Sequence, residues 1–215
     1  MAKFINKKSS FIGKLVKFGK NVTIYPNVVI EGTTYIGDNT TIYNGSYIID
    51  SIIGSNNTIY SSHIFKSKIG NDNIIGPYAH IRENNIINNN IKIGSFVEIK
   101  KSIVLDNSKI PHLSYIGDAE IGSNVNIGCG VITANYDGVN KNKTIIKDNA
   151  FIGCNTNLVA PIEIGKNTFI AAGSTITKKV KDNEFAISRT EQINKKIRKE
   201  NQNEKNTNNF IKFIH

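Results

Sequence analysis

Residues 24–59 read IYPNVVIEGTTYIGDNTTIYNGSYIIDSIIGSNNTI. Isoleucine recurs in this stretch every six positions from Ile24 to Ile48, and after one five-residue step the spacing resumes at Ile53 and Ile59. Neither the 3.6-residue period of a helix nor the strict alternation of a simple strand produces a period of six. A hexapeptide period is typical of parallel β-helices, in which each hexad supplies one short strand and one turn.

The same spacing extends along most of the chain. Further aliphatic residues in this pattern are Ile69, Ile75, Ile81, Ile93, Ile99, Ile121, Ile127, Ile146, Ile152, Leu158, Ile164, Ile170 and Ile176. The next residue is often glycine, as at Gly37 and Gly54, and glycine permits the turn conformation that follows. Three hexads would make one triangular coil, and stacked coils would bury their aliphatic residues against one another. The sequence therefore predicts an all-β fold, a parallel β-helix.

The pattern divides the chain into three parts. We expect a leader or cap over residues 1–20, the hexapeptide-repeat domain over 21–180, and a polar arm over 181–215 that is a short solvated helix or disordered. Within the domain, the polar segments 82–92 and 100–115 are predicted breaks in the repeat. Segment 134–144 is a predicted excursion with turn chemistry at Asp137-Gly138.

Composition narrows the class of protein. Among 215 residues, 27 Lys and Arg face 17 Asp and Glu, so the formal net charge is +10. Such an excess favours an acidic partner: nucleic acid, anionic lipid or a phosphorylated small molecule. Nucleic-acid binding by the C-terminal arm is not expected. There is no run of about 20 apolar residues, so membrane insertion is not expected. Lys14, Lys17 and Lys20 interrupt the apolar residues that a signal peptide would need. Two cysteines cannot form a disulfide framework, which indicates a cytoplasmic protein.

Several motifs are more specific than the repeat itself. They are GPYAHIR at 76–82, GSFVEIKK at 94–101, HLSYIGDAEIG at 112–122, VNIG at 125–128, NYDGVNK at 135–141, KTII at 143–146, LVAP at 158–161 and ISR at 187–189. From residue 76 to about 189, the chain closely resembles the acetyltransferase domain of the bacterial bifunctional N-acetylglucosamine-1-phosphate uridyltransferase/glucosamine-1-phosphate acetyltransferase. The resemblance covers over half of the chain. It implies a left-handed β-helix and a homotrimer with sites between adjacent subunits.

The implied reaction moves acetyl from acetyl-CoA to the amine of glucosamine 1-phosphate and feeds cell-wall precursor synthesis through UDP-N-acetylglucosamine. By the resemblance, His112 is the catalytic base, and the ordinary pKa of an imidazole, about 6.5, suits proton transfer near neutrality. Glu98 is a further candidate to orient or polarise the site. Of the substrate-binding positions, Arg82 and Lys100 would hold the sugar phosphate, and Tyr115 and Asn126 would contact the sugar. Lys141 lies on the 134–144 excursion and would be delivered across a subunit boundary. Arginine can grip phosphate with paired hydrogen bonds and lysine acts as a point charge.

The resemblance also implies a groove for acetyl-CoA, which is the co-substrate, and no metal. The donor-binding positions are Cys129, Asn135, Tyr136, Cys154, Ala172 and Arg189. Asn135 and Tyr136 would lie near the thioester, and Arg189 would meet the CoA phosphates. Cys154 stands where the family usually has serine, and we favour direct transfer over an acyl-cysteine intermediate.

Two departures and three alternatives accompany this interpretation. Residues 1–75 contain no nucleotide-binding glycine motif, so uridyltransferase activity is not expected from this chain, and a separate uridyltransferase is a candidate partner. The arm lacks the tryptophan common near the family's C-terminus. The alternatives are acetylation of another amino sugar, a non-catalytic scaffold for a uridyltransferase, and a carbonic-anhydrase-like protein. The last needs three histidine ligands, and the spacing of His63, His80, His112 and His215 does not fit.

Overall fold

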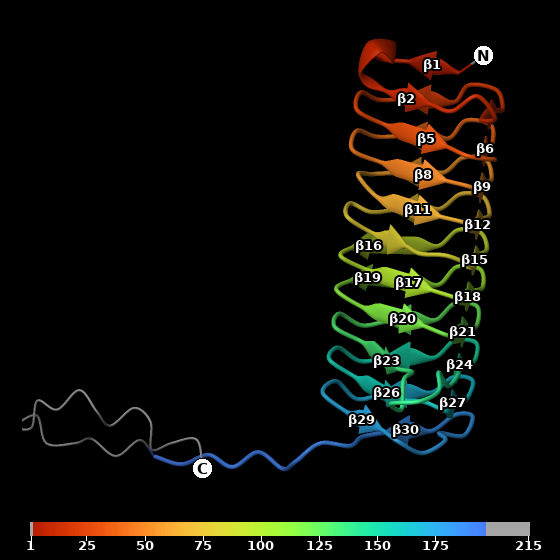
Figure 1. Cartoon of the computed structure of the whole chain (residues 1–215). Helices are drawn as coiled ribbons and strands as arrows, with labels where there is room; N and C mark the ends of the chain where they lie inside the picture. Colours follow the sequence, from red (N-terminus) through yellow and green to blue (C-terminus); the bar gives the residue numbers. More distant parts are fainter. Residues whose placement is uncertain (1, 197–215) are drawn as a thin grey trace, which may run out of the picture.

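The computed structural model describes residues 2–196, and it shows short strands wound into a stack of three-sided coils (Figure 1). The strands form three parallel sheets of 11, 10 and 9 strands, which we name sheets A, B and C. In each sheet a strand pairs with the third strand further along the chain, because each coil contributes one strand to each sheet. The last pair, β28 with β30, is the exception, since Val180 forms only an isolated bridge to sheet C. The all-β hexapeptide solenoid predicted from the sequence is confirmed.

The strands are two to four residues long. Sheet A contains β1 Lys3–Phe4, β4 Thr23–Ile24, β7 Thr41–Ile42, β10 Thr58–Ile59, β13 Ile74–Ile75, β16 Lys92–Ser95, β19 Lys109–His112, β22 Asn126–Ile127, β25 Phe151–Ile152, β28 Phe169–Ile170 and β30 Phe185–Ala186. Sheet B contains β2 Phe11–Ile12, β5 Val29–Glu31, β8 Tyr47–Ile49, β11 His63–Phe65, β14 His80–Ile81, β17 Glu98–Lys100, β20 Tyr115–Gly117, β23 Ile132–Ala134, β26 Asn157–Val159 and β29 Thr175–Ile176. Sheet C contains β3 Lys17–Phe18, β6 Tyr35–Ile36, β9 Ile52–Ile53, β12 Lys68–Ile69, β15 Ile86–Ile87, β18 Ile103–Val104, β21 Ala119–Ile121, β24 Thr144–Ile146 and β27 Ile162–Ile164.

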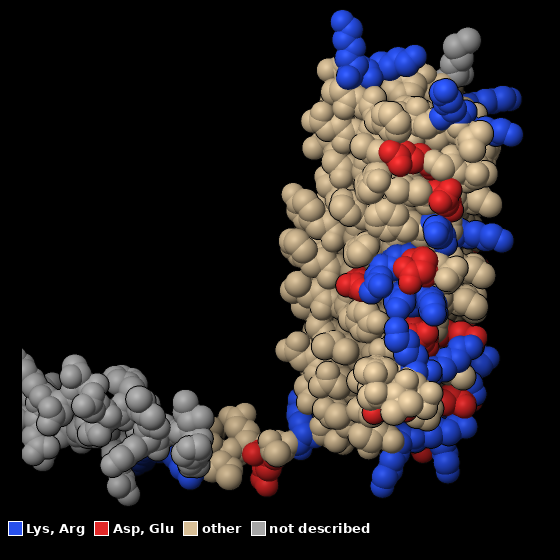
Figure 2. Space-filling model, viewed as in Figure 1, with Lys and Arg blue, Asp and Glu red and all other residues tan. Residues whose placement is uncertain are grey.

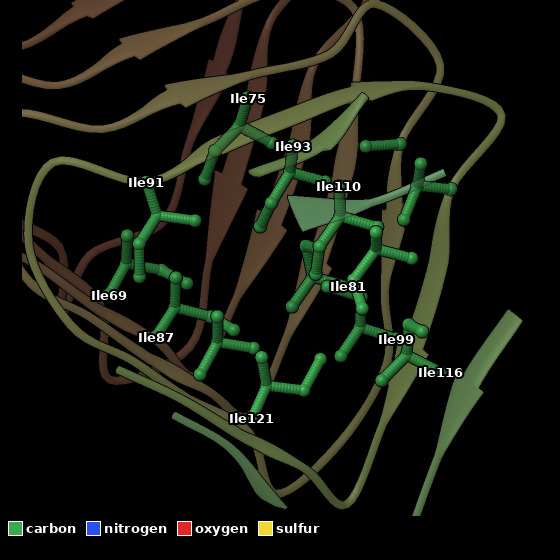
Figure 3. Close-up of a cluster of buried hydrophobic side chains, with 14 of the residues drawn as sticks. Ile69, Ile75, Ile81, Ile87, Ile91, Ile93, Ile99, Ile110, Ile116 and Ile121 are labelled. Atoms are coloured by element: carbon green, nitrogen blue, oxygen red, sulfur yellow. The ribbon is translucent and has the colours of Figure 1, made fainter. Parts of the chain in front are cut away.

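The repeated aliphatic residues fill the inside of the stack. Ile75, Ile93 and Ile110 come from successive strands of sheet A and point inward, next to the corresponding columns from the other two sheets (Figure 3). All three are completely buried. A fully buried isoleucine contributes about 1.5–3 kcal/mol, so the core stabilises the stack along its whole length and each coil depends on its neighbours.

The turns differ from the expectation in one respect. Of the glycines that follow an inward aliphatic residue between residues 2 and 196, Gly76 alone has a positive φ. The others are required by close packing: a Cβ on Gly70 would lie 2.6 Å from the carbonyl oxygen of Asn88 in the next coil. Asparagine is the commonest residue at the left-handed turn position, as at Asn39 (φ 56°) and Asn56 (φ 59°), since asparagine tolerates this conformation.

The expected breaks at 82–92 and 100–115 are wrong, because both segments continue the coils. Ile87 and Ile110 are buried within strands β15 and β19. Segment 82–92 keeps the six-residue spacing through Ile81, Ile87 and Ile93, and its polar, asparagine-rich turns made it look like a break. Segment 100–115 contains one five-residue side, from Ile99 to Val104. A five-residue side shortens the turn by one residue, and its left-handed residue, here Lys101, comes one position earlier.

The excursion at 134–144 is confirmed. It leaves the stack between β23 and β24, and an antiparallel bridge joins Tyr136 to Lys141. Asp137 accepts hydrogen bonds from the backbone N–H groups of Val139 (2.9 Å) and Asn140 (2.6 Å), which closes the turn. The loop is therefore an ordered hairpin-like structure that can place a side chain away from its own coil.

The two ends of the stack complete the description. Strands β1, β2 and β3, within the expected leader, already pair with the three sheets. After β30, residues 187–196 form neither strand nor helix, and the rest of the expected arm lies outside the described residues. The described chain has one helical element, the 3-10 turn Lys7–Ser9, and no helix long and apolar enough to span a membrane.

Candidate functional site

Three cationic side chains among the predicted substrate-binding residues meet on one edge of sheet B. We call the turns leading from sheet B to sheet C the B–C corner. Arg82 directly follows β14, and Lys100 is the last residue of β17. The two strands pair with Ile81 opposite Ile99, so Arg82 and Lys100 occupy equivalent positions in neighbouring coils. The Arg82 N–H donates to the Ile99 carbonyl at 2.8 Å. The excursion, which was expected to carry Lys141 across a subunit boundary, brings it beside Lys100 of its own chain. We call Arg82, Lys100 and Lys141 the cationic cluster.

Lys100 is the least exposed member of this cluster, at 8%. The ammonium of Lys141 lowers the pKa of Lys100 most, followed by burial and by the charge of Arg82. Within residues 2–196, no carboxylate lies within 4.0 Å of the ammonium of Lys100 or Lys141. A protonated lysine placed among other cations without an acidic partner is strained electrostatically, and a bound anion relieves that strain.

Arg82, in contrast, is held by carboxylates. Its Nη1 donates to Glu98 Oε1 at 3.0 Å, and its Nε lies 3.8 Å from Glu83 Oε2. Both ion pairs are partly exposed, so they orient the guanidinium more than they stabilise the fold. Figure 2 shows that on the viewed face charged side chains gather along one edge of the stack, with Asp and Glu interspersed among Lys and Arg.

Tyr115 and Asn135 belong to the same corner. Gly117 has no side chain, and a Cβ there would come within 2.5 Å of the Tyr115 hydroxyl and 2.8 Å of Asn135 Nδ2. Asn135 is buried, and its Nδ2 donates to Asp118 Oδ2 at 2.6 Å. Gly117 and Asp118 were not singled out from the sequence, although both lie within the quoted HLSYIGDAEIG motif.

Tyr136 begins the excursion and is exposed, and its hydroxyl donates to the Gly138 carbonyl at 2.6 Å. Tyr136 and Asn135 therefore lie on the B–C side of the stack, near the cationic cluster. They were predicted to contact the acetyl donor together with Cys129, Cys154 and Ala172. The latter three lie elsewhere in this chain.

His112 and the remaining donor-binding residues lie on the opposite edge of sheet B. We call the turns leading from sheet A to sheet B the A–B corner. His112, Cys129, Cys154 and Ala172 occupy the same position of this turn in four successive coils, which we call the corner column. Backbone bonds join the coils there, from Asn155 N to Cys129 O (2.7 Å), for example. Neighbouring coils are about 4.8 Å apart, so the corner column spans about 14 Å.

Arg189 closes the far end of the corner column. Its guanidinium donates from Nη1 to the carbonyl oxygen of Ala172 at 2.9 Å. The stretch that carries it, after β30, is exposed. A cation thus stands at one end of the corner column and the imidazole of His112 at the other.

The left-handed turn residue beside the corner column changes size at the coil of His112. Tyr78, Phe96 and Leu113 hold this position in three successive coils, all with positive φ and 58–60% exposed. In the next three coils the same position is taken by Gly130, Asn155 and Gly173. A Cβ added to Gly173 would meet nothing within 4 Å. Bulky residues with positive φ are uncommon and often mark functional sites. The corner therefore forms an apolar ridge that gives way to an open strip at His112.

Asn126 is separated from the other sugar-contacting positions. It lies in β22 on sheet A, between Lys109 and Phe151 in register. Together with Lys92 and Lys109 it lines an open groove of about 520 Å³. Tyr115 is on sheet B, so one chain does not bring Asn126 and Tyr115 together.

One chain therefore presents two groups of predicted site residues on opposite edges of sheet B. A side of the coil is about five residues wide, so the two corners are roughly 15 Å apart. His63 and His80 pack in an aromatic cluster with Tyr47 and Phe65 on the outer face of sheet B. Over residues 2–196 no group of three or more His, Cys, Asp and Glu side chains is arranged to hold a metal ion.

Comparison with known proteins supports the sequence motifs. The chain matches the models "Bacterial transferase hexapeptide (six repeats)" over residues 16–50 and 143–178 and "GlmU-like, C-terminal hexapeptide" over residues 43–123. It is 52% identical over 191 residues to the bifunctional protein GlmU of Listeria monocytogenes serotype 4a, which is 89% of this chain and 42% of that protein. The GlmU of Clostridium beijerinckii is 52% identical over 190 residues, with 88% and 42% covered. The chain thus spans less than half the length of these relatives, and the predicted resemblance is confirmed.

Solved structures agree on the fold. A UDP-N-acetylglucosamine acyltransferase of Francisella novicida superposes with a TM-score of 0.57 at 21% identity, over 85% of this chain and 67% of that one. The UDP-N-acetylglucosamine acyltransferase from Campylobacter jejuni gives a TM-score of 0.58 at 17% identity, over 73% and 67%. At these identities the similarity concerns the fold.

Proposed function

We propose that this chain, which is similar over 89% of its length to bifunctional GlmU proteins, is an N-acetyltransferase acting on glucosamine 1-phosphate with acetyl-CoA as donor. The observation that carries the proposal is the cationic cluster. Lys100 is buried beside two other cations with no acidic partner of its own among the described residues. Such a site is suited to a dianionic phosphate, because the ligand supplies the missing negative charge.

The acceptor would be held by its phosphate in the cationic cluster. The guanidinium of Arg82, already oriented by Glu98, presents N–H donors to phosphate oxygens, and Lys100 and Lys141 add point charges. The hydroxyl of Tyr115, over Gly117, is placed to contact a sugar hydroxyl. This arrangement fixes the sugar and leaves its amine free to point away from the phosphate.

The donor would lie along the corner column. Small side chains at Cys129, Cys154 and Ala172 leave room for an extended pantetheine arm, and Arg189 at the far end is suited to the CoA phosphates. His112 takes a proton from the acceptor amine as the amine nitrogen attacks the thioester carbonyl. The C–S bond then breaks, and CoA leaves as the thiol. General base catalysis of this kind contributes about 10²–10⁴-fold to a rate.

The placement of the two groups favours a homotrimer with shared sites. In one chain the corner column and the cationic cluster lie on opposite edges of sheet B, so a single copy cannot join acceptor and donor. A neighbouring copy whose A–B corner faces the B–C corner of the first would complete the site, and Asn126 on sheet A would approach from that neighbour. Closed rings of such heterologous contacts are a standard form of protein assembly.

The reaction is tested by measuring free CoA thiol released from acetyl-CoA with glucosamine 1-phosphate, and with glucosamine 6-phosphate as the control acceptor. Release with the 1-phosphate alone supports the proposal. His112→Ala should lower turnover about 10²–10⁴-fold, whereas His63→Ala, on the outer face of sheet B, should leave it near the wild-type value. No release with either sugar from folded protein, or release only with a nucleotide-linked amino sugar, would contradict the proposed acceptor.

The shared site is tested by mixing two inactive variants. His112→Ala retains a complete cationic cluster, and Lys100→Met retains a complete corner column. After the mixture is unfolded and refolded together, random reassembly should restore roughly a quarter of wild-type activity, because each interface needs one intact contribution from each copy. Mixtures that stay inactive while forming trimers would place both groups of residues in the site of a single chain.

A further inference from the structure

The corner column contains both cysteines of the chain in adjacent coils. Asn126 and Ile127 pair with Phe151 and Ile152, and this register continues to Cys129 opposite Cys154. The Asn155 N–H bond to the Cys129 carbonyl (2.7 Å) ties the two turns together at that point. Both thiols are free. Cys129 is one coil from His112, about 4.8 Å, and Cys154 is two coils away, about 9.6 Å.

Both cysteine residues are at least partly accessible to solvent. Cys154 is exposed and Cys129 is half-buried. The ridge of Tyr78, Phe96 and Leu113 ends one coil earlier, and the strip below it is lined by small residues. A small-molecule thiol or disulfide can therefore reach the corner column without any movement of the core.

We propose that Cys129 is a site of thiol–disulfide exchange, at which a coenzyme A disulfide leaves one CoA bound covalently in the donor groove. The inference rests on the proposed function, because it requires that the corner column binds CoA. Acetyl transfer needs the thioester carbon next to His112, and the sulfur is one bond away from that carbon. The sulfur of a bound CoA unit is thus closer to Cys129 than to Cys154.

The exchange is balanced and needs no further oxidant. The Cys129 thiol loses its proton to solvent, and the thiolate attacks one sulfur of the coenzyme A disulfide. The bond between the two CoA sulfurs breaks as the new Cys129–CoA disulfide forms. The other CoA leaves as a thiolate and takes up a proton. Cys129 is oxidised and one CoA is reduced, and the attached CoA then fills the groove that acetyl-CoA requires.

Binding of the CoA part of the reagent in the groove selects the cysteine that reacts; the general reactivity of an exposed thiol does not. Glutathione disulfide carries the same reactive bond but lacks the nucleotide and the pantetheine arm, so it gains nothing from the corner column or from Arg189. Cys154, which is more exposed than Cys129, would react first if accessibility alone decided the site. The proposal therefore makes opposite predictions from simple surface oxidation, both for the reagent and for the residue.

The experiment begins with fully reduced protein, whose binding of acetyl-CoA and acetyl transfer are measured first. It is then exposed to coenzyme A disulfide or, separately, to glutathione disulfide, and the mass of the intact protein and of its peptides is followed over time. We expect one CoA per chain on Cys129, slower labelling by glutathione disulfide, protection by acetyl-CoA, and loss of transfer in proportion to labelling. Dithiothreitol should restore both mass and activity.

Two variants make the assignment sharp, each compared with its own activity before exposure. Cys129→Ser should remove labelling and inhibition, while Cys154→Ser should keep both. Labelling at Cys154 alone, equal rates with the two disulfides, or inhibition that persists in Cys129→Ser would overturn the proposal. Reduced protein that binds no acetyl-CoA would instead refute the proposed function. Binding and turnover without labelling would refute the exchange site alone.

Discussion

Replacing Asn39 by alanine should destabilise the coil stack by about 2 kcal/mol. Asn39 stands in the left-handed conformation (φ 56°), which costs alanine about 1 kcal/mol more than asparagine. Its side chain also accepts from Asn21 Nδ2 and donates to Asn56 Oδ1, both at 3.2 Å, and each such exposed bond contributes about 0.5 kcal/mol net. For a chain of this size the sum should lower the melting temperature by roughly 4–8 °C.

The same substitution at Asn44 provides a matched control. Asn44 is also an exposed asparagine in a turn, but it has no positive φ, and its side chain makes no hydrogen bond within the described part of the chain. Thermal unfolding followed by circular dichroism should therefore show little change for Asn44→Ala. Asn39→Asp should fall in between, because aspartate tolerates the left-handed region and can still accept from Asn21. Equal melting temperatures for Asn39→Ala and Asn44→Ala would refute this account of the turns.

Three further predictions follow from other parts of the structure. Gly70→Ala should destabilise the protein by about 1–3 kcal/mol in urea unfolding, as its Cβ would press on the next coil; Gly13→Ala, whose nearest contact would be 3.2 Å, should cost less. Lys141→Gln should raise the pKa of Lys100 in an NMR titration, since it removes the largest cause of the depression, and should raise the KM for the sugar phosphate roughly tenfold to a hundredfold. The pKa of His80 is lowered mainly by burial, so this side chain should titrate below the pKa of a peptide histidine, about 6.5. Because the unfolded chain then binds more protons between these two pKa values, stability should rise as the pH increases across that window, and His80→Gln should remove this component.

The fold could be predicted because one physical requirement is repeated in every coil. Each side of the triangle needs one inward aliphatic residue, and the same chemistry recurs from Ile24 to Ile176. The roles of individual turn residues were harder to predict, because glycine and asparagine both favour turns but for different reasons. The structure separates them: glycine such as Gly70 allows coils to approach closely, and asparagine such as Asn39 supplies the left-handed residue.

The resemblance assigned a role to each residue of the candidate site, but it did not give their arrangement within one chain. Five-residue and six-residue sides alternate irregularly, so a fixed period of six misplaces the corners and makes 100–115 look like an interruption. Segment 82–92 keeps the period through Ile87, and it was misread because its turns are polar and rich in asparagine. Only with the corners in place is it evident that His112 and Lys100 lie on opposite edges of sheet B. Asp118 was missed because its role, holding Asn135, depends on a contact between coils 17 residues apart.

The coil stack also explains how a binding groove can arise without disturbing the core. A given turn position recurs in line at intervals of about 4.8 Å, so a change from large to small residues along one corner creates a linear strip that suits an extended ligand. The inward residues of the same coils, such as Ile110 and Ile127, are unaffected because they occupy other positions of the repeat. The step from Leu113 to Gly130 lies beside His112, the one imidazole in the corner column. Filling the strip by Gly173→Leu should therefore weaken acetyl-CoA binding more than it affects sugar-phosphate binding, and comparing the two KM values would show whether the strip serves the donor.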